Sequence, residues 1–132
     1  MTTELDRDDF GRITHDPATG RLELEWFEST ANMTDQDFRR SLDRLAELAE
    51  EHRPRHVVID VTLFGFAPGP DTAHWREETI IPRYNDAGIE KFGFVMPPGS
   101  PPSGEPVPEP GADFPTGWFA SRAALEAWLK QP

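Results

Sequence analysis

The chain has 132 residues, and its 24 acidic and 13 basic side chains give a formal net charge of −11. This length predicts one domain whose core is large enough to fold unaided. The absence of cysteine excludes a disulfide framework, a thiolate metal site and a cysteine nucleophile. The acidic balance argues against nucleic-acid binding, and no apolar run of about 18 residues predicts a membrane span. The polar, acidic start is not typical of a signal peptide, so we expect a cytoplasmic protein.

The first predicted elements are two strands that follow a flexible N-terminus at residues 1–10. Apolar residues at positions 22, 24 and 26 alternate with Glu23 and Glu25, the period-two pattern of a strand with one wet face. A Pro-x-x-Gly turn at residues 17–20 joins this strand to residues 12–16. We expect this antiparallel hairpin at the edge of the sheet, where the two glutamates would discourage further strand pairing.

An amphipathic helix and a buried strand come next. Thr34 has the place of an N-cap, and Asp37 completes a capping box. Apolar residues then recur at helical spacing from Phe38 to Ala49, and Pro54 prevents the helix from continuing. The β-branched run at residues 56–61 predicts a strand buried on both faces, as in a parallel sheet. A helix between two strands is the pattern of a β-α-β crossover.

The second half of the chain is again predicted to alternate helices and strands. Asp71 is the expected cap of a second helix that Pro82 breaks or kinks and Gly88 ends. A strand at 91–96 precedes a Pro-rich insertion at 97–117, whose prolines between 97 and 110 favour an extended segment outside any sheet. A short strand at 118–119 and a helix capped by Ser121 close the chain, with an expected Glu126–Lys130 ion pair.

The predicted order is therefore β-β-α-β-α-β-β-α over residues 11–132. This is a single α/β domain with a mostly parallel sheet and an N-terminal antiparallel hairpin.

Several motifs in this order point to one family. They are Val57-Val58-Ile59-Asp60, Phe64-x-Phe66, Trp75 with Glu78, Ile81-Pro82, the step from Ala87 to Val95, and Phe119-x-Ser121-x-x-x-Leu125-x-x-Trp128-Leu129. Together they resemble the STAS-like small bacterial proteins, whose SpoIIAA-like fold also includes the lipid-binding CRAL-TRIO domains. In partner-switching STAS proteins, a phosphorylatable Ser or Thr follows an Asp at the start of the second helix. Asp71-Thr72 is the nearest match, so the resemblance implies Thr72 as a phospho-acceptor, although the loop before it is longer and the Pro-rich insertion is a departure.

Candidate ligand-binding residues gather after the predicted central strands, where open α/β sheets bind ligands. They are Asp60, Phe64, Phe66, His74, Trp75 and Arg76. His74, Arg76 and a helix N-terminus suit an anionic ligand, whereas the aromatic rings suit an apolar one. Structural alternatives exist for each: the aromatic residues as core, Asp60 as the support of the next loop, and the others as a solvated helix face.

The sequence holds no phosphate-binding loop, zinc-protease motif or serine-hydrolase elbow, and its four histidines lack metal-site spacing. We therefore predict no catalytic residue, cofactor or metal, and expect a non-enzymatic STAS-like regulatory or protein-interaction module. The alternative is a small-molecule or lipid-binding domain of CRAL-TRIO-like type. An enzyme that uses His74, Arg76 and Asp60 is the third hypothesis. The expected partner is a protein or a small apolar or anionic ligand, and a homodimer stays open.

Overall fold

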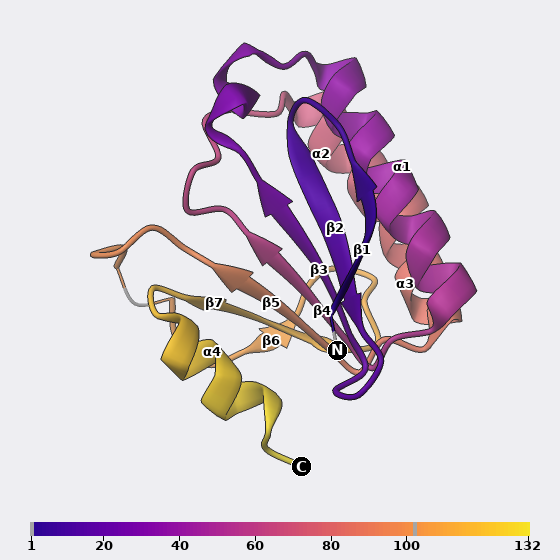
Figure 1. Cartoon of the computed structure of the whole chain (residues 1–132), viewed down its shortest axis with the longest axis vertical. Helices are drawn as coiled ribbons and strands as arrows, with labels where there is room; N and C mark the ends of the chain where they lie inside the picture. Colours follow the sequence, from indigo (N-terminus) through magenta and orange to yellow (C-terminus); the bar gives the residue numbers. More distant parts are fainter. Residues whose placement is uncertain (1, 102) are drawn as a thin grey trace.

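A seven-stranded mixed sheet runs through the computed structural model, which describes residues 2–101 and 103–132. The strand order is β1-β2-β3-β4-β5-β7-β6, with β3, β4, β5 and β7 parallel and the other pairs antiparallel (Figure 1). This is the expected α/β domain with a parallel centre. The strands are β1 (Thr3–Arg7), β2 (Gly11–Asp16), β3 (Arg21–Trp26), β4 (His56–Asp60), β5 (Lys91–Val95), β6 (Val107–Pro108) and β7 (Pro115–Phe119).

Helices cover both faces of this sheet unequally. One face carries α1 (Asp35–His52), α2 (Pro70–Trp75), the π-helical turn η2 (Arg76–Ile80) and α3 (Ile81–Ala87). The other face carries α4 (Arg122–Leu129), which lies near β5 and β7 (Figure 1). A short 3-10 helix, η1 (Glu28–Asn32), links β3 to α1.

The hairpin of β2 and β3 is confirmed, but its expected place at the sheet edge is wrong. Leu22, Leu24 and Trp26 are buried as the alternation predicts. Residues 3–7, which fall in the segment expected to be flexible, form β1 and pair with β2, while β3 pairs with β4. An acidic segment can serve as an edge strand because Leu5 packs against the core and Arg7 pairs with Glu4 at 2.9 Å.

The start and end of α1 follow the sequence signals. Thr34 accepts from the backbone of Asp37, and the Asp37 carboxylate accepts from the backbone of Thr34, which completes the capping box. The helix ends at His52, and Arg53 takes a left-handed conformation with φ 47° immediately before Pro54.

The second helical segment has a different cap from the predicted one and continues past Pro82 without a break. Its N-cap is Gly69 rather than Asp71, and Pro70 takes the first helical position, where its missing N–H costs nothing. Pro82 does not break the segment, because Ile81 stays helical and donates its N–H to the carbonyl of Arg76. This wide π turn immediately precedes the proline and joins α2 to α3. Gly88 ends the segment as predicted, with φ 81°.

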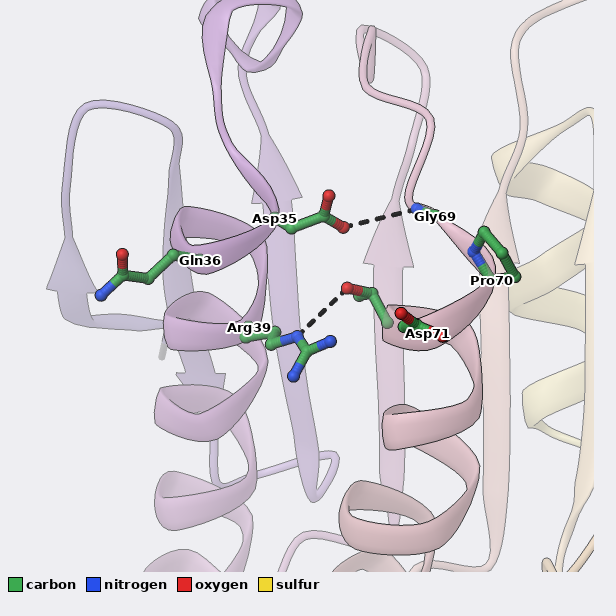
Figure 2. Close-up of a pocket in the computed structure, with 7 residues that line it drawn as sticks. Asp35, Gln36, Arg39, Gly69, Pro70 and Asp71 are labelled. Carbon is green, nitrogen blue, oxygen red and sulfur yellow. Dashed lines mark hydrogen bonds between the residues drawn. The ribbon is translucent and has the colours of Figure 1, made fainter.

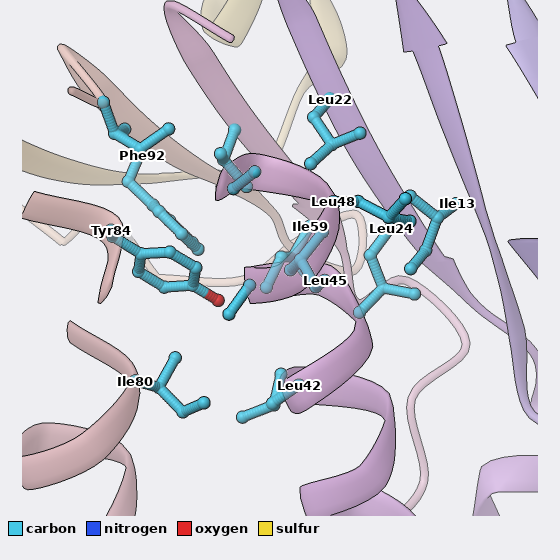
Figure 3. Packing of buried hydrophobic residues seen from close by; sticks show 14 of the residues in the cluster. Ile13, Leu22, Leu24, Leu42, Leu45, Leu48, Ile59, Ile80, Tyr84 and Phe92 are labelled. Carbon is cyan, nitrogen blue, oxygen red and sulfur yellow. The ribbon is translucent and has the colours of Figure 1, made fainter. Parts of the chain in front are cut away.

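The main hydrophobic core lies between the sheet and α1 with α3. Figure 3 shows Leu45 and Leu48 of α1 meeting sheet residues such as Leu24 and Ile59. Tyr84 of α3 is also fully buried here, and burial raises the pKa of its phenol to about 12.

A second core beneath α4 contains Val58, Val95, Leu125 and Leu129. A Cβ at Gly93 would lie 2.4 Å from Leu125, so α4 packs on bare backbone of β5. The expected Glu126–Lys130 pair is not what fixes this helix, because Glu126 accepts from Arg21 of β3 at 2.9 Å instead.

The Pro-rich segment is tied to the domain and partly enters the sheet. Val107 and Pro108 form β6 on the free edge of β7, where a proline is tolerated because one side of the strand needs no N–H donor. The expectation that residues 97–110 stay outside any sheet is therefore wrong for these two residues. Glu109 pairs with Arg76 of η2, and the carbonyl of Gly111 accepts from Asn85 at 2.8 Å.

Candidate functional site

Asp60 ends β4 and supports the loop that follows. Its Oδ1 accepts from the backbone N–H of Thr62 at 2.9 Å, and its Oδ2 accepts from Arg122 at 3.2 Å. Arg122 of α4 also donates to Glu23 at 2.9 Å, so one guanidinium joins β3, β4 and α4. These bonds fit the structural alternative for Asp60, in which the carboxylate holds the loop.

His74 and Arg76 are each engaged by a different carboxylate. The His74 side chain is 69% exposed, and its Nε2 lies 2.8 Å from Glu78, one turn further along the chain. Arg76 lies over the ring of Phe92 and pairs with Glu109 of the Pro-rich segment. Asp60, His74 and Arg76 each contact a different partner, and no hydrogen bond or ion pair among the described residues joins any two of the three.

The aromatic loop residues Phe64 and Phe66 pack against the core. The Phe64 ring centroid lies 5.2 Å from that of Trp26 and 5.9 Å from that of Phe38, while Phe66 lies 5.8 Å from Phe38. The Gly65 N–H between them donates to the Thr30 hydroxyl at 2.9 Å. These contacts hold the two rings as structural aromatics over the end of the main core.

A groove of about 430 Å³ lies between the start of α1 and the start of α2 (Figure 2). The Gly69 N–H donates to Asp35 at 3.4 Å, and Nε of Arg39 donates to the Thr72 hydroxyl at 3.1 Å. Arg39 also lies over the ring of Trp75, 5.2 Å from its centroid. The residues that line the groove are Asp35, Gln36, Arg39, Gly69, Pro70, Asp71 and Thr72.

The electrostatics of the groove combine one cation with two carboxylates. Asp35 and Asp71 lie in the first turns of their helices, where the helix dipole favours negative charge. Nearby, a hydrogen bond from the Thr34 backbone holds the pKa of Asp37 below its usual value, and Arg40 adds to the effect. Arg39 is the one cation among the described residues that line the groove.

Thr72 occupies the start of α2, but its position is buried. Only 2% of the residue is exposed, and its hydroxyl is occupied by Arg39. A kinase would therefore need the first turn of α2 to open before it reached this hydroxyl. A phosphate placed here would lie beside the Arg39 guanidinium, an arrangement that favours charge-assisted hydrogen bonds.

Sequence reasoning found Thr72 and Trp75 of this region but missed Asp35 and Arg39. Both missed residues lie on the polar face of α1, and nothing in local spacing distinguishes them from other charged positions. The available signal was topological: two helices that each follow a parallel strand and pack on one face of the sheet begin near the same sheet end.

Comparisons with known proteins give no further guide to the groove. No protein-family model, curated protein or solved structure matches this chain. Within residues 2–101 and 103–132, no helix is long and apolar enough to cross a membrane. The same part of the chain places no three His, Asp or Glu side chains together as a metal site.

Proposed function

We propose that this chain is a non-enzymatic, STAS-like regulatory module that binds a protein partner at the α1–α2 groove. The observation that carries the proposal is the Arg39–Thr72 hydrogen bond, which places an arginine and a candidate phospho-acceptor in one groove. Arginine is enriched among the residues that dominate protein interfaces. Nε of Arg39 is engaged by Thr72, and the charged end of the side chain is oriented by Trp75.

The charges of the groove favour a partner that offers both a hydrogen-bond acceptor and basic side chains. A carboxylate or carbonyl of the partner would accept from Arg39, and basic side chains would meet Asp35 and Asp71. Phosphorylation of Thr72 would replace a neutral acceptor by a dianion beside Arg39 and would occupy the guanidinium that the partner uses. The module would therefore release its partner when Thr72 is phosphorylated.

A lipid-binding role has less support. Phe64 and Phe66, which the apolar-ligand alternative places around a cavity, pack against Trp26 and Phe38. The groove between α1 and α2 is instead bordered by charged side chains.

Affinity purification from the native cell, with charge variants of the full chain, tests the proposal. Arg39→Glu should reduce capture of the partner at least about tenfold, since it reverses the one cation of the groove. Arg40→Glu is the matched control, because Arg40 is the adjacent exposed arginine of α1 and does not line the groove. Capture that Arg39→Glu and Arg40→Glu affect equally, or the lack of any specific partner, would contradict the proposal.

The phospho-switch needs its own variants because Thr72 is buried. Thr72→Glu should also lower capture, provided that circular dichroism shows a folded protein. Thr72→Val keeps the shape and removes only the acceptor of Arg39, so it should fold and leave capture within about threefold of the wild type. Equal capture by folded Thr72→Glu and wild-type protein would exclude the switch while leaving the docking groove intact.

A further inference from the structure

Three cations of this acidic chain line one cavity far from the α1–α2 groove. A cavity of about 360 Å³ lies at the amino ends of β3 and β4, where its lining includes Arg21, Arg55, His56, Glu126 and Lys130. Figure 1 places this end of the sheet near the C-terminus, opposite the start of α1. Lys91, the other lysine of the chain, lies close enough to influence the charge of His56.

The local charge balance at this cavity is positive, although the whole chain carries −11. Arg21 is paired with Glu126 at 2.9 Å, and Arg55 with Glu90 at 3.3 Å. Among the described residues, neither lysine forms an ion pair. Lys91 donates instead to the backbone carbonyls of Trp128 and Gln131 at 2.7 and 2.6 Å. Three permanent cations, Arg21, Arg55 and Lys130, thus line the cavity against the one side-chain carboxylate of Glu126, while Lys91 and Glu90 lie beside it.

We propose that this cavity binds the phosphate group of a small phosphorylated molecule. The Arg55 guanidinium offers planar paired donors that match a phosphate, and Lys130 adds a point charge. Both side chains are exposed, and the Arg55–Glu90 pair is held only at the surface, so Arg55 can turn toward a ligand at little cost. Arg21 contributes positive electrostatic potential to the cavity rather than a direct hydrogen bond, since its Nη1 and Nη2 groups already donate to Glu126. The cavity volume exceeds one phosphate and fits a small molecule attached to it.

Anion binding at this cavity is coupled to protonation of His56. Burial lowers the pKa of its imidazole, Arg55, Lys91 and Arg21 lower it further, and Glu90 opposes them. Of the groups on α4 that line the same cavity, Lys130 opposes protonation and Glu126 favours it. A bound anion favours the protonated ring, so binding takes up a proton and affinity rises as the pH falls. Sulfate keeps its charge over this range, which makes it the probe that isolates His56 from the titration of phosphate itself.

Calorimetric titration of the full chain with sulfate, inorganic phosphate and phenyl phosphate tests the site. We expect saturable binding of all three, with Arg55→Gln and Lys130→Gln each weakening affinity about tenfold. Arg40→Gln at the other end of the molecule is the control and should leave affinity unchanged. Tighter binding of phenyl phosphate than of inorganic phosphate supports a phosphorylated molecule as the ligand, whereas equal affinity supports free phosphate.

Two results would overturn the inference. One is non-saturable uptake of all three anions, and the other is equal affinity in wild-type, Arg55→Gln and Lys130→Gln proteins. The test is independent of the docking proposal, because Arg55 and Lys130 do not line the α1–α2 groove. Arg39→Glu should accordingly leave sulfate binding unchanged, whether or not it abolishes partner capture.

Discussion

At the scale of single residues, a basic side chain can bind a ligand more readily if no carboxylate of the fold already engages it. Arg76 was a candidate for anion binding, but Glu109 engages it in a site where the two side chains are only 18% and 12% exposed. His74 is exposed, and its Nε2 lies 2.8 Å from a carboxylate oxygen of Glu78. Arg39 and Lys130, neither of them a sequence candidate, are not paired with a carboxylate among the described residues. The two proposals therefore rely on Arg39 and Lys130, which the fold leaves without a carboxylate, and on Arg55, whose pair with Glu90 lies at the exposed surface.

Two buried threonines show how much a hydrogen-bonded hydroxyl contributes to the free energy of unfolding. Thr30 and Thr116 are both 0% exposed. The Thr30 hydroxyl donates to the Phe27 carbonyl and accepts from Gly65, whereas the Thr116 hydroxyl has no partner among the described residues. We expect Thr30→Val to destabilise the fold by about 1–3 kcal/mol, because it leaves the Gly65 N–H unpaired.

The same substitution at Thr116 should be neutral or stabilise by up to about 1 kcal/mol, since it removes a polar atom that nothing satisfies. Urea denaturation of both variants, compared at equal m-values, gives the two free energies of unfolding. A loss at Thr116 as large as that at Thr30 would show that the Thr116 hydroxyl does have a partner.

At the scale of elements, the sequence predicts the helices and strands whose signals lie within the element itself. The capping box and helical spacing placed α1, and the alternation of apolar and acidic residues placed β3. The edge strands β1 and β6 were missed because the acidic and proline-rich residues in them disfavour strands in isolation. Pairing with a neighbour that is already formed overrides that preference, and such pairing has no local signature.

The same limit explains what the sequence missed at the two candidate sites. Glu126 has a possible partner four residues on, but the structure pairs it with Arg21, more than a hundred residues away in the chain. Arg39 meets Thr72 across two helices. Contacts of this kind depend on the packing of whole elements, so residue spacing along the chain cannot identify them.

Two contacts hold the Pro-rich segment against the helices. The mostly buried Glu109 side chain pairs with Arg76 of η2, and the side-chain oxygen of Asn85 of α3 accepts from the Asp113 N–H at 2.8 Å. We expect Glu109→Gln to destabilise the protein by about 1–3 kcal/mol, because Arg76 then keeps its charge in a mostly buried site without a carboxylate. Hydrogen exchange of the amides in residues 103–117 should become faster.

Glu105→Gln is the control for Glu109→Gln, since Glu105 is exposed in the same segment. Adding Arg76→Met to Glu109→Gln should recover much of the lost stability, because no buried charge is then left alone. Unchanged exchange and unchanged stability in Glu109→Gln would show that β6 and the Asn85 contacts hold the segment without the ion pair.

At the scale of the whole molecule, the α1–α2 groove and the basic cavity differ in charge and lie at opposite ends of the parallel strands (Figure 1). The α1–α2 groove at one end carries Asp35 and Asp71 with a single arginine, and the cavity at the other end carries an excess of cations. Three of the four histidines, His15, His52 and His56, lie at or beside this second end. The molecule therefore has a groove with two carboxylates at one end and, at the other, a basic cavity whose charge grows when His56 is protonated.

This arrangement predicts that stability falls as the pH drops below about 6.5. Burial lowers the pKa of both His15 and His56 in the folded protein, with His52 adding to the effect at His15 and the cations around His56 adding to it there. The unfolded chain keeps the ordinary histidine value of 6.5, so below it the unfolded state binds more protons than the fold and is favoured. Above that pH both states are neutral and the effect vanishes. Carboxylates with lowered pKa, such as Glu50, act only below their ordinary value of 4.5, outside this window.

Urea denaturation between pH 7.5 and 5.5, in a buffer free of phosphate and sulfate, measures this slope. His56→Gln should make the slope shallower, because one of the two histidines with a lowered pKa is gone while His15 keeps its contribution. A wild-type protein that gains stability as the pH falls through this window would contradict the prediction. Added sulfate should reduce the loss at low pH in the wild type, and about tenfold more sulfate should be needed for the same effect in Lys130→Gln, because an anion in the basic cavity stabilises the protonated ring of His56.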